Sequence, residues 1–316
     1  MTALGTFTQL LEITFALLFA PAFLGWVNQC RAWLQNRRAP SLLQPYFGLR
    51  KLFHKDAILA ENASSLFRLA PYVLFGTMVA AAAIIPSMGT GLPLSTAADS
   101  IALVGLLATA RVFLSLAAMD IGTAFGTMGA RREMMVGFLA EPALLMVLFV
   151  AAMISKTTSL PLIAEGLTTR PLALYPSLAF TAVAFTMVLL AENARIPVDN
   201  PATHLELTMI HEATLLEYSG RHLAMMEWAA ALKLFNYACI GFALFVPWGT
   251  STEAWGPQGL LLAIPLLVVK LALAGAGLAL IETLSAKLRV FRAPEFLATA
   301  FLLAVLGLLV HLLLGD

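Results

Sequence analysis

The sequence predicts an all-α protein: a polytopic membrane helix bundle of about eight transmembrane helices. The first observation is composition, since 60% of the 316 residues are hydrophobic and only 12% are charged. That charged share is about half of what a soluble domain carries. Polar groups this scarce cannot cover the surface of a protein in water. A bilayer must therefore be the main solvent. The second observation is a series of eight apolar runs, each near the roughly 20 residues that a helix needs to cross the hydrocarbon core.

The runs follow one another along the whole chain. In order they are Phe7–Val27, Leu69–Met88, Ile101–Met119, Val136–Ser155, Leu172–Ala191, Trp228–Trp248, Gly259–Ile281 and Phe296–Leu314. Their length fits helices, because a strand of a membrane barrel needs only about 10 residues. The loops between them are too short for a soluble domain, so residues 1–316 are expected to form one integral membrane domain. Glu12 lies inside the first run and nothing basic precedes it, which argues against a cleaved signal.

The loops differ in charge in a way that predicts orientation. Four loops carry 14 of the 19 Lys and Arg residues, and they span 28–68, 120–135, 192–227 and 282–295. The opposite side has only Lys156 and Arg170. Basic residues gather on the cytoplasmic side of membrane proteins. These four loops are therefore predicted to be cytoplasmic, with both termini on the periplasmic side.

Composition also excludes several classes of function. A net charge of +1 leaves no bulk positive field for nucleic acid. Cys30 and Cys239 are too few to hold an iron–sulfur cluster or a zinc ion alone, and their different expected depths argue against a disulfide. The spacing of His204, His211 and Glu212 matches no standard zinc site. This chain is therefore expected to bind no metal or cofactor itself.

The loop 192–227 is unusually acidic. Its six carboxylates belong to Glu192, Asp199, Glu206, Glu212, Glu217 and Glu227. Asn200 and Pro201 form a helix-start pattern, and a helix from there would place Glu206 and Glu217 on one face. Glu217 would then lie four residues from Arg221, close enough to pair. A solvated helix face is the alternative. The leucines interleaved with the acids favour burial and a functional carboxylate set.

Other ionisable residues fall within or beside the apolar runs. Glu141 lies early in the fourth run, nine residues after Arg132, so both are expected in the cytoplasmic half of the protein. Arg111, Lys233, Lys270 and Glu282 are further candidates, since charges inside membranes tend to be functional. For Lys270, a structural ion pair with Glu282 is an equal alternative to a functional role. Glu12 is expected to face either a partner subunit or the interface.

Four motifs resemble one known family. The segments ARIPVDNPATHLEL and LLEYSG resemble the loop between helices five and six in the respiratory complex I subunit 1 family, whose members belong to the proton-pumping NADH–quinone oxidoreductase. Hydrogenase-4 component C and formate hydrogenlyase subunit 4 share this loop. Three further motifs resemble the same family in the same order: SLLQPYFGLRKLFHKD at 41–56, TAFGTMGARREMMVGFLAEP at 123–142 and RVFRAPEFLATAF at 289–301.

Departures from the family pattern indicate a branch. The quinone-reducing members resemble RIPFDLPEAEAEL here, with three alternating acids after the proline. This chain has Ala202 and His204 at the first two positions and keeps only Glu206. The Gly-Pro-Asn stretch before LLQP is replaced by RRAPS. Both changes favour the hydrogenase branch over quinone binding.

The resemblance implies a membrane-anchor and coupling subunit in the cytoplasmic membrane of a bacterium or archaeon. Such a subunit is not catalytic alone. It docks a soluble electron-transfer arm and links redox chemistry to ion movement. The implied partners are hydrogenase-like large and small subunits, an iron–sulfur subunit and antiporter-like membrane subunits, with iron–sulfur clusters and a nickel–iron centre in those partners.

The residues assigned to this role form two groups. The expected proton path comprises Glu141, Glu192, Asp199, Glu206, Glu212, Glu217 and Lys233. The expected interface and support residues are Arg132, Arg195, Arg50, Lys51, His204 and Arg221. Three alternatives stay open: a quinone-binding subunit, a stand-alone secondary transporter and a passive anchor. A transporter would predict internal repeats with paired broken helices, and the halves show no convincing repeat.

Overall fold

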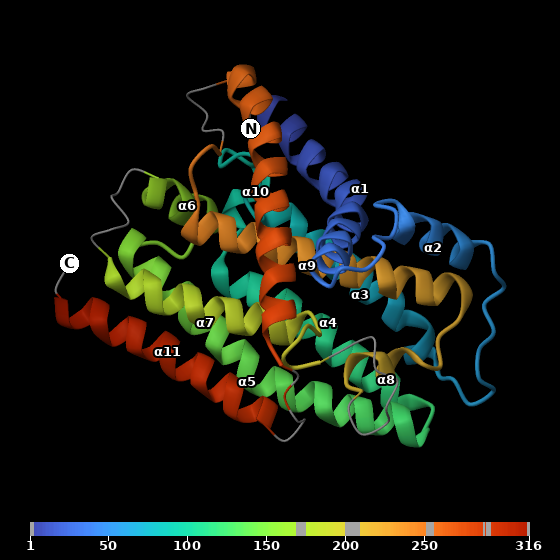
Figure 1. Ribbon diagram of the computed structural model, residues 1–316. Coiled ribbons are helices and arrows are strands. Elements are labelled where there is room, and N and C mark those ends of the chain that lie inside the picture. The colour runs from blue at the N-terminus through green and yellow to red at the C-terminus, as the bar shows by residue number, and fades with distance from the viewer. Residues whose placement is uncertain are drawn as a thin grey trace.

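The structure is a computed structural model that describes residues 3–168, 175–199, 209–250, 256–286, 288 and 292–314. Within these residues it is helical throughout, apart from turns, short loops and one isolated bridge between Asp99 and Ser159. The helices are α1 (Ala3–Leu34), α2 (Gln44–Phe53), α3 (Ser65–Ile84), α4 (Ser100–Asp120), α5 (Ala124–Ser155), α6 (Leu160–Thr168), α7 (Pro176–Glu192), α8 (His211–Leu215), α9 (Gly220–Phe245), α10 (Gly256–Leu284) and α11 (Ala293–Leu314), with a 3₁₀ turn at Pro93–Thr96 (Figure 1).

The predicted bundle is confirmed. Seven of the described helices, α1, α3, α4, α5, α9, α10 and α11, are long and apolar enough to cross a membrane. The apolar α7, with 17 residues, corresponds to the predicted fifth run. The short helices α2, α6 and α8 lie between the long ones in the chain.

Two helices, α5 and α9, begin about two to three turns before the expected apolar runs, whereas the other differences are about one turn or less. The fourth run was expected from Val136, but α5 begins at Ala124, where the Thr123 hydroxyl accepts a hydrogen bond from the Gly126 N–H. Likewise α9 begins at Gly220 and not at Trp228. An apolar run marks only the part of a helix that contacts lipid. The helix extends beyond that part where its polar groups find partners. Most of the expected loop 120–135 is therefore helix.

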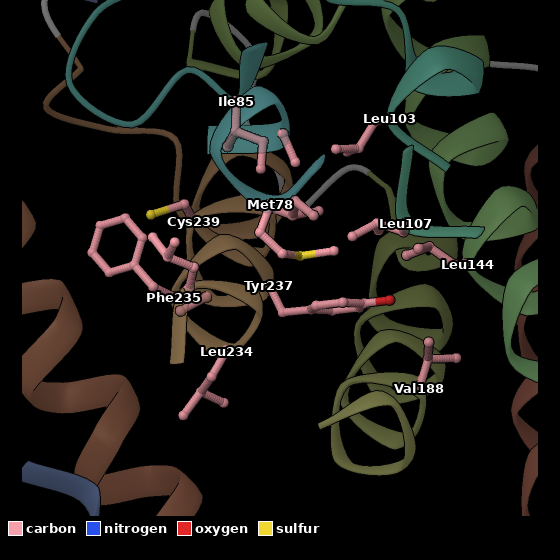
Figure 2. Packing of buried hydrophobic residues seen from close by; sticks show 14 of the residues in the cluster. Met78, Ile85, Leu103, Leu107, Leu144, Val188, Leu234, Phe235, Tyr237 and Cys239 are labelled. Carbon is pink, nitrogen blue, oxygen red and sulfur yellow. The ribbon is translucent and has the colours of Figure 1, made fainter. Parts of the chain in front are cut away.

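Each long helix packs against a few neighbouring helices. Helix α3 lies against α4 and α9, α5 against α4, α7 and α11, and α10 mainly against α1 (Figure 1). The core lies where α3, α4, α5, α7 and α9 meet. Figure 2 shows Met78, Leu107, Leu144 and Val188 around the buried ring of Tyr237.

Polar groups within the bundle are tied to backbone carbonyls of neighbouring helices. Trp26 Nε1 donates to the Ala272 carbonyl at 2.9 Å, and Trp228 Nε1 donates to the Leu17 carbonyl at 3.1 Å. Asn236 Nδ2 donates to the Met78 carbonyl at 2.9 Å. Buried donors need such partners, because an unmade hydrogen bond in an apolar medium costs free energy. Cys30 and Cys239 are buried and free, as predicted.

Candidate functional site

A buried arginine on α4 gathers three carboxylates. Arg111 Nη1 lies 2.8 Å from Glu141 Oε1, and its Nε lies 3.6 Å from Glu133 Oε1. Its second terminal nitrogen, Nη2, donates to Glu192 at the end of α7. Gly137 on α5 makes this possible, because a Cβ there would overlap the guanidinium. One charge thus joins three helices in the interior.

Helix α9 completes this group. Lys233 Nζ lies 2.9 Å from Glu192, and the Tyr237 hydroxyl, one turn further on, also hydrogen-bonds Glu192. The Glu192 side chain is only 2% exposed. We call Arg111, Glu133, Glu141, Glu192 and Lys233 the Arg111 cluster. With every group ionised it has a net charge of −1, which is costly in a low dielectric and favours shared protons.

A second, smaller cluster has the opposite charge. Glu282 on α10 faces Arg195 at 3.2 Å and Arg31 of α1 at 3.5 Å, and the Glu282 side chain is 1% exposed. We call these three residues the Glu282 cluster. Its net charge is +1 when all three are ionised. Burial lowers the pKa of Arg195 below its usual value, an effect that Glu282 opposes.

A cavity of about 490 Å³ separates the two clusters. Arg31 and Arg195 line one part of it, and Arg111, Glu192 and Lys233 line another. The rest of the lining is largely apolar and comes from α1, α3, α4 and α9. Residues of both clusters, whose net charges are opposite, thus line one partly open cavity. Its largely apolar lining strengthens the interaction between these charges.

Helix α8 supplies another wall of this cavity through His211 and Glu212. The His211 N–H donates to Asp199 Oδ2 at 3.1 Å, and Arg132 Nη1 donates to the Met209 carbonyl at 2.7 Å. Burial lowers the pKa of the His211 imidazole, while nearby Glu133 and Asp199 oppose the shift and Lys233 and Arg111 add to it. A titratable ring therefore borders the cavity from outside the spans.

The segment after α8 is joined to the first loop. Ser219 Oγ donates to the Ile58 carbonyl at 2.7 Å and accepts the Ile58 N–H at 2.8 Å. Gly220 has a φ of +53°, and a Cβ there would lie 2.8 Å from the carbonyl oxygens of Lys55 and Asp56. Tyr218 stacks on Phe67 and donates to its carbonyl at 3.0 Å, and burial raises the Tyr218 pKa. We call this contact the loop joint.

The predicted site residues fall into three sets. Glu141, Glu192 and Lys233 meet in the Arg111 cluster, while Asp199, Glu212, Arg132 and Arg195 lie on the segments that border the cavity. Glu217 lies in the turn after α8, and Arg50, Lys51 and Arg221 are exposed. His204 and Glu206 lie outside the described residues.

Two structural expectations were wrong, and one of the two alternatives for Lys270 is excluded. Residues 209–210 and 216–219 are not helical, so no single helix from Pro201 carries both Glu206 and Glu217. Among the described residues Glu217 forms no ion pair with Arg221, because the chain turns between them. Lys270 does not pair with Glu282, since its Nζ donates to the Val246 carbonyl and Glu282 is held by arginines.

Glu12 also differs from its prediction. Its side chain faces neither a partner nor the interface but is buried, and Oε1 accepts the N–H groups of Met88 at 2.7 Å and Gly89 at 2.9 Å. Glu12 thus holds the segment after α3 against α1. A lone acid in an apolar run does not reveal such backbone partners from sequence.

The sequence did not reveal the ion pairs that four residues of the two clusters form. Arg111 was a candidate without a partner, and Glu282 had only Lys270 as a possible partner. Arg31 and Glu133 fell within expected loops and had no assigned role. Arg111 carried a usable signal, because a cation in the middle of an apolar run needs a buried anion. Glu133 follows two arginines and had no such signal. Within the described ranges, no group of three or more His, Cys, Asp or Glu side chains is placed to hold a metal.

Comparisons with known proteins agree on one family. The family model described as NADH dehydrogenase matches residues 8–313. Formate hydrogenlyase subunit 4 of Escherichia coli K12 is 34% identical over 288 residues, covering 91% of this chain and 92% of that protein. Hydrogenase-4 component C of the same strain is 34% identical over 247 residues, with 77% and 76% coverage.

A solved structure has the same fold. A chain of the membrane-bound sulfane sulfur reductase, an archaeal respiratory membrane complex, aligns with a TM-score of 0.80 at 20% identity, covering 95% of this chain and 96% of that one. At that identity the likeness concerns the fold.

Proposed function

The chain belongs to the NADH dehydrogenase family, and from this premise we propose that it is the membrane coupling subunit of a multisubunit redox complex of the hydrogenase or formate hydrogenlyase type. In this role it anchors a soluble electron-transfer arm and links redox events to the movement of protons or other ions. It is an integral membrane protein. The proposed orientation puts the first, third, fifth and seventh loops in the cytoplasm.

The Arg111 cluster is the observation that carries this proposal. Three carboxylates share two cations in a low dielectric, so their proton occupancy is a joint property of the group. A charge that arrives or leaves nearby changes this occupancy. Electron transfer in a docked partner can thus move protons through this chain.

The proposed path begins at the cytoplasmic side of the cavity. Asp199, Glu212 and Glu217, with Glu206 of the same loop, would collect protons near α8, and His211 borders the same space. Glu192, Glu141 and Lys233 would take them into the bundle. Arg132 and Arg195 support the two walls. This order follows the elements from the surface inward.

The soluble arm is proposed to dock beside the loop joint. Ile58 and Leu216 are exposed there, at 76% and 52%. Arg221 lies close by in the chain, and His204 belongs to the same loop. An iron–sulfur subunit with the hydrogenase-like large and small subunits fits this face, and antiporter-like subunits would pack on the lipid side. Iron–sulfur clusters and a nickel–iron centre would belong to the partners.

The composition of the native complex tests this assignment. The full chain, tagged and purified in mild detergent from its own membranes, should bring a hydrogenase-like pair, an iron–sulfur subunit and antiporter-like subunits, with iron and nickel by metal analysis. Isolation of the chain by itself, with transport activity in liposomes, would instead indicate a secondary transporter.

A quinone-binding role is the second candidate, and the cavity favours it. Leu24, Asn28 and Arg31 of α1 and several residues of α9 line this space, which is where a quinone would enter. Lys233 and His211 could donate hydrogen bonds to a carbonyl head group. Reduction of a short-chain quinone by the purified complex, lost in Lys233→Met, would favour this candidate. A complex that reduces protons but no quinone would favour the first.

A further inference from the structure

The chain between α1 and α2 turns back along α1. Gln29 Nε2 donates to the Pro40 carbonyl at 2.9 Å, a Cβ on Gly25 would meet the Leu42 carbonyl, and the Tyr46 hydroxyl donates to the Leu18 carbonyl. From Gln29 to Leu18 is about 16 Å along a helix axis. These three contacts, which we call the ladder, hold residues 40–46 along α1, progressively closer to the apolar part of that helix.

The ladder fixes the depth of α2. The apolar stretch of α1 ends near Val27, so Leu42 and Tyr46 contact α1 within its apolar part. On the other side, Phe53 meets the ring of Trp228 at 6.3 Å, at the start of the apolar part of α9. Helix α2 therefore lies at the level where hydrocarbon gives way to head groups, and it projects beside α1 in Figure 1.

The outer surface of α2 suits that level. Leu49 is buried against the bundle, while Phe47 is 54% exposed and Leu43, just before the helix, is 50% exposed. Arg50 and Lys51 are exposed beside them. Residues 28–55 contain no Asp or Glu, so nothing acidic within this segment neutralises these charges. Of the described residues, Asp56 and Glu227 of α9 are the acidic ones nearest to α2. Exposed apolar side chains next to cations are typical of helices that lie on anionic membranes.

We propose that α2 is a binding surface for anionic phospholipids, with Phe47 among the acyl chains and Arg50 and Lys51 on the phosphate groups. Long basic side chains reach head groups from such a position by extending along the interface. The inference goes beyond the redox proposal and does not depend on it. It also places Arg50 and Lys51 outside the docking face, because a helix at this depth is covered by lipid.

A photocrosslinker at position 47 tests the proposal directly. The purified complex with Phe47→benzoylphenylalanine would be placed in nanodiscs with equal amounts of phosphatidylglycerol and phosphatidylcholine, irradiated and analysed by mass spectrometry. We expect lipid adducts with phosphatidylglycerol in excess. In Arg50→Gln/Lys51→Gln the excess should fall, by about fivefold per charge removed if each contributes as a basic residue near an anionic surface does.

Two matched variants separate charge from structure. Arg50→Lys/Lys51→Arg should keep the excess, since it keeps both charges. Arg68→Gln/Arg131→Gln removes two exposed cations elsewhere and should also keep it. Adducts with a protein subunit at position 47, or an unchanged lipid ratio in Arg50→Gln/Lys51→Gln, would overturn the proposal. The redox proposal is tested by the identity of the subunits and metals in the complex, which neither result changes, so the two proposals fail separately.

Discussion

At the scale of single residues, Arg111 stabilises the interior of the bundle by pairing with three carboxylates. It is the cation shared by Glu133, Glu141 and Glu192, and it is only 6% exposed. Arg111→Gln leaves these carboxylates with Lys233 alone. Breaking a buried ion pair from one side costs about 3–5 kcal/mol, because the remaining charge is unpaired. We therefore expect the thermal midpoint of the purified complex to fall sharply.

Arg131→Gln is the matched control, since Arg131 is exposed and surface charges contribute little. Its midpoint should stay near that of the wild type. An Arg111→Gln protein as stable as the control would contradict the role of Arg111 as the shared cation.

His211 predicts how stability depends on pH. Burial holds its pKa below the usual histidine value of 6.5, so the unfolded chain takes up a proton at a higher pH than the folded one. Above the usual pKa both forms are neutral and His211 has no effect. As the pH falls below it, the folded state loses stability relative to the unfolded one.

The measurement is the thermal midpoint at pH 7.5 and pH 5.5 for the wild type and His211→Gln. The variant should lose less stability over this interval, because it removes the group that titrates. An equal loss in both proteins would show that the His211 ring titrates normally in the fold.

At the scale of elements, the loop joint shows how a short sequence motif sets geometry. Gly220 adopts a left-handed φ of +53°, and two carbonyl oxygens of the first loop occupy the space that a Cβ would need. Gly220→Val has no relaxed conformation there. We expect residues 55–60 and 216–219 to exchange amide hydrogens faster in this variant, with a loss of bound soluble subunits. Gly48→Ala, which has open space around it, should change neither.

Helix boundaries were the part of the elements that the sequence could not supply. Apolar runs identified the spans correctly, because lipid contact demands about 20 apolar residues regardless of partners. The N-terminal part of α5 escaped this reasoning, since Arg131, Arg132 and Glu133 read as loop charges. Glu133 is in fact buried against Arg111. Only the three-dimensional partner explains why a helix continues through such residues.

At the scale of the whole molecule, the two charge clusters and the cavity between them form one unit. The sequence identified Glu141 and Lys233 as candidates, because charges inside apolar runs are costly, and Glu192 as the first acid of the acidic loop. It could not pair them, since their partners come from other helices: Arg111 is 30 residues from Glu141 and 81 from Glu192. The sequence could not predict the ion pairs of the Glu282 cluster for the same reason. They join α1, the loop after α7 and α10 through Arg31, Arg195 and Glu282.

Proton sharing in the Arg111 cluster is the proposed link between redox turnover and ion movement. Glu141→Gln tests this link most directly, because Gln keeps the shape, removes one titrating group and leaves Glu192 paired with Arg111 and Lys233. Glu295→Gln, at an exposed carboxylate of α11, is the control.

The measurement is the ion gradient formed per electron transferred by the assembled complex in sealed proteoliposomes. Glu141→Gln should assemble and bind its partners, yet form a gradient no larger than that of an uncoupled control, while Glu295→Gln should match the wild type. If Glu141→Gln kept the full redox rate and the full gradient, the coupling role of the cluster would be contradicted.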